Sequence, residues 1–180
     1  MDIAQAQSDV RRIYSGGWGG PAVSALIWLV AAALTDYVGI GVGAAVLFLG
    51  GAFLIFPVNM ALNRALSGHA DLPRGHPMRG LALQTTMTMV ASLLAAWAIS
   101  TVLPGAYFPL AMVVVGAHYF PFTHLYGEVV FLIAGAVQVV TGLLILVNDS
   151  PVSLGGYVMA ALLALQSLAL FLRNRSRRTV

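Results

Sequence analysis

The residues best suited to chemistry in this chain lie in one stretch, GAHYFPFTHLYGE, at positions 116–128. The stretch holds His118 and His124, two of the four histidines, and Glu128, the one glutamate of the sequence. Histidine changes charge near neutral pH, and burial can raise the pKa of a carboxyl group toward that range. These groups could bind and release protons while a small solute passes, which is the chemistry of a proton-linked transporter.

The same three side chains also form an accepted set of zinc ligands, with two nitrogens and one carboxylate. A metal bound by His118, His124 and Glu128 could activate water, which would make the protein an intramembrane metal-dependent hydrolase. However, the sequence has no HExxH motif, and the two histidines lie on either side of Pro121 at a spacing that is not typical of metal sites. It also has no GxSxG motif and no cysteine. We therefore expect no cofactor and favour a role other than catalysis.

Residues at helical spacing predict which way the helix after this stretch faces. Steps of three and four residues from Glu128 lead to Phe131, Gly135, Gln138 and Gly142, a narrow polar and small face on an otherwise apolar segment. Polar groups are costly in lipid, so this face should point into the protein.

A second polar stripe, Gln84, Thr88 and Ser92, should face inward for the same reason. Asn59 and Asn63 lie one helical turn apart and at a similar depth. The sequence therefore predicts a polar pocket near the cytoplasmic leaflet. Its expected members are Asn59, Asn63, Gln84, Thr88, His118, His124, Glu128 and Gln138.

These residues also have a purely structural interpretation. Tyrosine is enriched at the level of the lipid headgroups, and histidine could lie there too. Glu128 could then form one structural pair with an arginine or a histidine. In that case the protein would be an accessory or scaffold protein with no site of its own.

The composition indicates the environment of the chain. Of the 180 residues, 59% are hydrophobic and 8% are charged, against about 25% charged in soluble domains. So few charges cannot cover a globule, and the lipid bilayer must be the partner of this surface. All nine basic residues are arginines that flank apolar segments, so the net charge of +3 indicates membrane topology and not nucleic-acid binding.

Six apolar segments are predicted to cross the membrane as helices. They cover about 21–35, 38–56, 81–103, 105–120, 127–147 and 152–172. A short cytoplasmic helix capped by Asp2 should precede them. The second span should kink at Pro57, continue to Ser67 and lead into a cytoplasmic loop at about 68–80. The predicted fold is an all-α, polytopic transmembrane bundle that forms one domain over 1–180.

The arginines predict the orientation of this bundle. They precede the first span, separate the second from the third and follow the sixth, so alternating spans place all of them on one side. The opposite connections contain Asp36, a Pro–Gly pair and Asp149 but no arginine. Both termini are therefore expected in the cytoplasm, and the protein in an inner membrane. The GxxxG spacing of Gly39 and Gly43 indicates close helix packing, within the chain or in a homodimer.

Several blocks of sequence resemble a known family. They are MDIAQAQSDVRRIYSGG, GPAVSALIWLVAA, GGAFLIFPVN and FPLAMVVVGAHYFPFTHLYG, in this order along the chain. They are similar to a family of small bacterial multi-pass membrane proteins defined as a domain of unknown function. The resemblance implies a six-helix inner-membrane protein without an established activity. It implies no catalytic residues, but it directs attention to the block that contains His118.

Overall fold

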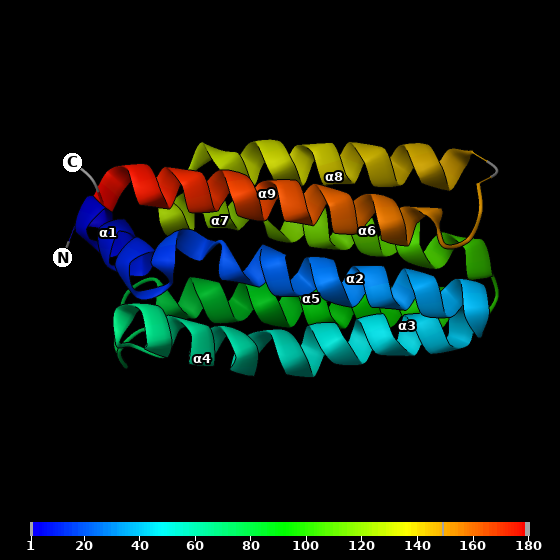
Figure 1. Ribbon diagram of the computed structural model, residues 1–180, viewed down its shortest axis with the longest axis horizontal. Coiled ribbons are helices and arrows are strands. Elements are labelled where there is room, and N and C mark those ends of the chain that lie inside the picture. Colours follow the sequence, from blue (N-terminus) through cyan, green and yellow to red (C-terminus); the bar gives the residue numbers. More distant parts are fainter. Residues whose placement is uncertain (1, 149, 179–180) are drawn as a thin grey trace.

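Six apolar helical segments run side by side along the long axis of the molecule, which confirms the predicted all-α bundle (Figure 1). The computed structural model describes residues 2–148 and 150–178, so Asp149 lies outside the described residues. The spans are Gly19–Tyr37, Ile40–Ser67, Arg79–Ser100, Pro104–Tyr126, Val129–Val147 and Leu154–Arg177. Each is long and apolar enough to cross a bilayer, which indicates a multi-pass membrane protein.

The spans are built from the following elements. The helices are α1 Ile3–Ile13, α2 Gly19–Tyr37, α3 Ile40–Leu49, α4 Ile55–Ser67, α5 Arg79–Ser100, α6 Tyr107–His118, α7 Phe120–Tyr126, α8 Val129–Val147 and α9 Leu154–Arg178. Short 3₁₀ turns at Ser15–Gly17 and Pro104–Ala106 precede α2 and α6, and a π-helical turn at Gly50–Leu54 joins α3 to α4.

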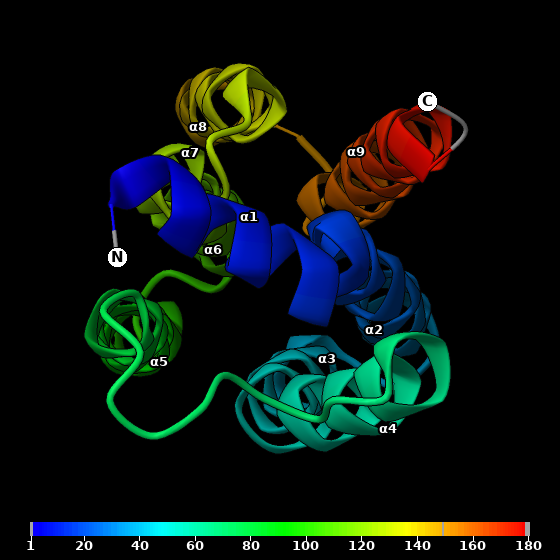
Figure 2. The same cartoon turned by 90° about the vertical axis from the view of Figure 1, so that its left-hand side faces the viewer.

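Helix α1 is amphipathic and lies across one end of the bundle (Figure 2). Its N-terminus has the predicted cap, because the Asp2 carboxylate accepts a hydrogen bond from the backbone N–H of Gln5 at 2.8 Å. Ala6, Val10 and Ile13 recur at helical spacing and are buried against the bundle. The N-terminal segment is therefore a packed part of the fold.

The second span contains the expected irregularity, but one turn earlier than Pro57. The ring of a proline conflicts with the carbonyl of the residue four positions before it, which is Phe53 here. The π-helical turn at Gly50–Leu54 widens the helix at that position and lets the span continue. The span then ends as predicted, at Ser67, because Gly68 adopts a left-handed conformation with φ 75°.

The fourth span differs from the prediction. It continues past residue 120 to Tyr126, because Pro121 lies in the first turn of α7, where a proline is tolerated. The chain turns only at Gly127, whose φ of 64° favours glycine. Although four residues separate His124 from Glu128, they share no helix face, because His124 lies in α7 and Glu128 caps α8 on the other side of this turn.

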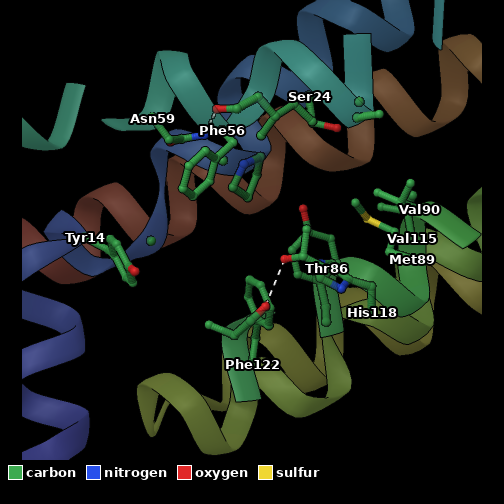
Figure 3. A pocket seen from close by; sticks show the side chains of 18 of the residues that line it. Tyr14, Ser24, Phe56, Asn59, Thr86, Met89, Val90, Val115, His118 and Phe122 are labelled. Atoms are coloured by element: carbon green, nitrogen blue, oxygen red, sulfur yellow. Dashed lines mark hydrogen bonds between the residues drawn. The ribbon is translucent and has the colours of Figure 1, made fainter. Parts of the chain in front are cut away.

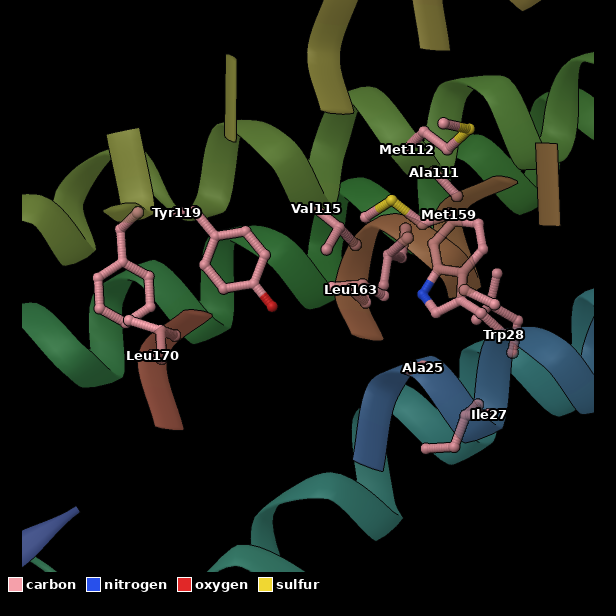
Figure 4. Close-up of a cluster of buried hydrophobic side chains, with 14 of the residues drawn as sticks. Ala25, Ile27, Trp28, Ala111, Met112, Val115, Tyr119, Met159, Leu163 and Leu170 are labelled. Atoms are coloured by element: carbon pink, nitrogen blue, oxygen red, sulfur yellow. The ribbon is translucent and has the colours of Figure 1, made fainter. Parts of the chain in front are cut away.

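The helices pack through small residues and a shared apolar core. A Cβ atom on Gly135 of α8 would lie 2.6 Å from the carbonyl oxygen of Gly116 in α6, so the two backbones are in direct contact. In the core, Trp28 of α2 lies next to Met159 and Leu163 of α9 (Figure 4). These contacts join α2, α6, α8 and α9 tightly, whereas α5 stands apart from α4 in the end view (Figure 2).

Candidate functional site

A cavity of about 550 Å³ lies between the first four spans. Its walls come from α2, from the α3–α4 span, from α5 and from α6–α7, and the residues just before α2 and α5 close one end. Ligand sites in proteins have volumes of ~300–1,000 Å³ and mostly apolar walls. Figure 3 shows Asn59 and Phe56 on one wall facing Thr86 and His118 on the other.

Three of the eight predicted pocket residues line this cavity: Asn59, Asn63 and His118. Asn59 donates a hydrogen bond from its amide nitrogen to the carbonyl of Ile55, one turn earlier, at 2.9 Å. Its amide oxygen makes no hydrogen bond among the described residues and lies against α2, 2.7 Å from where a Cβ atom on Gly19 would be. Asn63 is buried one turn further along α4.

His118 has a defined tautomer. Its Nδ1 lies 3.0 Å from the carbonyl oxygen of Thr85 in α5, and a carbonyl can only accept, so Nδ1 carries the proton. In a neutral ring Nε2 is then an acceptor, and among the described residues the ring of His118 has a hydrogen bond through Nδ1 only. The bond also ties α5 to α6 at the depth of the cavity.

The end of the cavity near α1 is closed by a charged group of residues. The Tyr14 hydroxyl donates to Asp71 Oδ1, and Arg79 lies 3.7 Å from the second oxygen of the same carboxylate. Burial and, as the second cause, the hydrogen bond to Asp71 raise the pKa of Tyr14 above its ordinary value, so this hydroxyl keeps its proton. Tyr14, Asp71 and Arg79 all line the cavity.

The cavity also reaches the outer surface of the bundle, between α4 and α5. Phe53, Phe56, Leu83 and Met87 line it, and each is also more than half exposed. All four belong to the membrane-spanning segments. The opening is therefore lateral and apolar, at a level where acyl chains surround the protein.

Three predicted pocket residues lie outside the cavity and are exposed. The stripe of Gln84 and Thr88 does not face inward, because the buried face of α5 is rotated by one residue and runs through Leu93, Ala96 and Ser100. His124 lies on the exposed side of α7.

Glu128 is buried, but at the end of the bundle and not in the cavity. One carboxylate oxygen lies 3.1 Å from both Nε and a terminal nitrogen of Arg173, and the other lies 2.5 Å from Arg177. Arg11 of α1 lies close by and donates to the carbonyl of Tyr126. Burial lowers the pKa of Arg11 below its ordinary value. Glu128 thus has the structural pairing that the sequence left open as an alternative.

Gln138 is also buried away from the cavity, between α8 and α9. Its amide nitrogen donates to Oε1 of Gln166 at 2.8 Å. The remaining amide atoms, Oε1 of Gln138 and Nε2 of Gln166, are buried without a hydrogen-bond partner among the described residues. The predicted inward face of α8 is correct, since Phe131, Gly135, Gln138 and Gly142 are its buried residues.

The structure does not bring the expected metal ligands together. His118 lies in the cavity, His124 is exposed and Glu128 pairs with arginines. Within residues 2–148 and 150–178, no three His, Asp or Glu side chains converge on a point that could bind a metal ion.

The sequence did not predict the cavity-lining residues that lie outside the polar stripes. Tyr14 and Asp71 approach the cavity from segments outside the spans, and Arg79 is the first residue of the third span. Thr86 approaches it from the face of α5 next to the one predicted. A signal existed for α5: Met89, Leu93 and Ala96 follow one another at helical spacing. It was not distinctive, because the lipid-facing side of a membrane helix is equally apolar.

Comparison with known proteins identifies the family of this chain. A family model with the description "Family of unknown function (DUF7010)" matches residues 3–173, nearly the whole chain, which confirms the resemblance seen in the sequence. No curated protein and no solved structure matches the chain.

Proposed function

Because this chain belongs to DUF7010, a family of unknown function, we propose its role from the geometry alone: the protein binds an amphiphilic molecule that enters sideways from the bilayer. One observation carries this proposal. The same cavity has an apolar opening between α4 and α5, within the spans, and polar groups toward the arginine-rich end of the bundle. A molecule with a chain in lipid and a head near the membrane surface matches both ends.

The distribution of polarity supports an amphiphile and not a water-soluble solute. The lateral opening is formed by Phe53, Phe56, Leu83 and Met87, which offer no hydrogen bond to a polar solute. Because these four side chains are apolar, an apolar chain can occupy the opening without leaving any polar group unpaired. Asn59, Asn63 and His118 deeper in the cavity can then fix the head of the ligand.

Proton coupling through Glu128 has less support. The carboxylate is bound by Arg173 and Arg177 and does not line the cavity. A group that couples protons to transport needs contact with the solute path, and this one has its contacts with the end of α9.

The positions of the arginines support one orientation of the bundle in the membrane. Helix α1, the loop between Ser67 and Arg79 and the end of α9 lie at the same end of the bundle (Figure 1). The positive-inside rule would place this end in the cytoplasm, so the ligand would come from the cytoplasmic leaflet of an inner membrane.

Gly51 offers a way to fill the cavity without disturbing the backbone. Gly51 lines the cavity, and a Cβ atom there would meet its nearest neighbour, a methyl of Leu93, at 4.0 Å. Gly51→Leu should therefore extend into the space that a ligand needs. Gly41→Leu is the matched control, because Gly41 lies in the same span and has nothing within 4 Å of its added Cβ atom.

The experiment uses purified protein in lipid nanodiscs and a hexadecanol probe that carries a diazirine. After photolysis, we expect labelled peptides to come from the cavity walls on α4 and α5, in the native protein and in Gly41→Leu. Gly51→Leu should lose most of that labelling. Labelling spread evenly over the outer surface, or unchanged in Gly51→Leu, would refute the proposed function.

A further inference from the structure

We propose that the ligand has an uncharged head and donates a hydroxyl hydrogen bond to Nε2 of His118. The ligand class is then membrane-soluble phenols and long-chain alcohols. This inference rests on the proposed function and adds the chemistry by which the cavity selects among amphiphiles.

The charge of the cavity favours a neutral head. Asp71 and Arg79 are the formally charged side chains among the described residues that line it, and their opposite charges lie 3.7 Å apart. An anionic head would meet Asp71 together with Arg79, and a cationic head would meet Arg79 together with Asp71. Either ion would leave water without a net opposite charge to compensate its desolvation.

The protonation of His118 sets the direction of the hydrogen bond. Thr85 holds the proton on Nδ1, so Nε2 presents a lone pair. That lone pair needs a donor, and a ketone, an ester or an ether has none to offer. A hydroxyl group supplies the donor and costs no charge.

The surroundings of His118 also suit the oxygen of such a hydroxyl. The ring of Phe122 lies 4.6 Å from the imidazole, and Phe122 lines the cavity on the same wall (Figure 3). Tyr119 also lines the cavity, the centre of its ring lies 5.8 Å from that of His118, and its hydroxyl makes no hydrogen bond within the described part of the chain. An alcohol or phenol oxygen can accept from such a donor while its proton is given to Nε2.

Matched ligands separate this hydrogen bond from general apolar binding. The first pair is tritiated 4-nonylphenol and 4-nonylanisole, in which a methyl group replaces the phenolic proton. The second pair is tritiated 1-tetradecanol and its methyl ether. Equilibrium binding is measured on the full chain in nanodiscs, with empty nanodiscs as the blank.

We expect the hydroxyl member of at least one pair to bind about 5-fold tighter than its ether, the ratio that one neutral hydrogen bond of ~1 kcal/mol gives. His118→Phe should reduce this ratio to about one while the ether affinity stays the same. His118→Gln keeps an amide N–H for Thr85 and an oxygen for the ligand, so it should restore part of the preference. If the nonylphenol pair shows this preference, the ligand is a phenol, and if the tetradecanol pair shows it, the ligand is an aliphatic alcohol.

Other results would overturn the inference, and they differ from failure of the proposed function. Equal binding of hydroxyl and ether in the native protein, or a preference that survives in His118→Phe, would remove the hydrogen bond but leave the cavity as a ligand site. Tighter binding of decyl phosphate than of either hydroxyl probe would show an anionic ligand instead. If no probe binds above the blank, or if Gly51→Leu binds all of them as the native protein does, the proposed function itself fails. The native comparison stands even if His118→Phe does not fold.

Discussion

Replacing Glu128 by glutamine should destabilise the bundle and leave ligand binding unchanged. The side chain of Glu128 is 6% exposed, whereas those of Arg173 and Arg177 are 48% and 47% exposed. Glutamine keeps the shape but replaces one oxygen by an amide that points a donor at a guanidinium. The substitution therefore removes the charge and one acceptor while both arginines stay in place.

The size of the effect follows from this mixed exposure. Removing one partner of a fully buried ion pair costs ~3–5 kcal/mol, and an exposed pair contributes ~0–1 kcal/mol. Here the carboxylate is buried and the arginines are half in solvent, so we expect a loss of about 2 kcal/mol. The position of Glu128 just before the first turn of α8 adds a small favourable interaction of its negative charge with the helix dipole.

The assay measures unfolding of purified protein by titration with SDS, together with 4-nonylphenol binding in nanodiscs. A double-mutant cycle with Arg177→Gln should show strong coupling, since the second change removes a partner already lost. Arg12→Gln is the control, because the Arg12 side chain is 59% exposed and pairs with Asp9 within one turn of α1, so its loss should change stability little.

Two results would refute this reasoning. If Glu128→Gln unfolds in SDS as the native protein does, the contacts of Glu128 with the arginines contribute nothing to the stability of the fold. Loss of 4-nonylphenol binding at unchanged stability would show that Glu128 belongs to the ligand path, and it would restore the proton-coupled interpretation.

Two further predictions concern packing and topology. Gly135→Ala should lower stability by about 2 kcal/mol, because its Cβ atom would lie 2.6 Å from the carbonyl oxygen of Gly116 and force α6 and α8 apart; Gly41→Ala, in open space, should show no such loss in the same SDS titration. Since the chain has no cysteine, single cysteines replacing the exposed Ser8 and Thr101 can be tested with an impermeant maleimide on right-side-out vesicles. Thr101→Cys should react and Ser8→Cys should not, and the reverse pattern would invert the proposed orientation.

Hydrophobic periodicity and small residues were sufficient to predict much of the fold. Six apolar segments, the N-terminal cap at Asp2 and the end of the second span at Ser67 follow from local rules on length, capping and glycine. The inward face of α8 could also be predicted, because Gln138 is too polar for lipid and the glycines on its face need a close neighbour.

The candidate site was only partly predictable, and α5 shows why. Gln84 and Thr88 form a polar stripe, yet both are exposed. Gln84 lies in the second turn of the span Arg79–Ser100, where a polar group can reach the headgroups or water, but Thr88 lies near the middle of that span. The rule that polar residues face inward therefore fails for Thr88, a residue type whose hydroxyl can bond a backbone carbonyl of its own helix. Asn59, Asn63 and His118 lie at similar depth and do face the cavity, so depth alone could not separate the two groups.

The sequence by itself determined that lipid surrounds this chain, that it forms six spans and that all its arginines gather at one end. These properties depend on composition and on residues near one another in the chain. Tertiary structure alone decided that Glu128 pairs with Arg173 and Arg177, that Gln138 meets Gln166, and that Tyr14 and Asp71 close a cavity open toward lipid. The physical reason is that each of these contacts joins segments far apart in sequence, so it depends on how neighbouring helices are rotated and spaced, which no local pattern encodes.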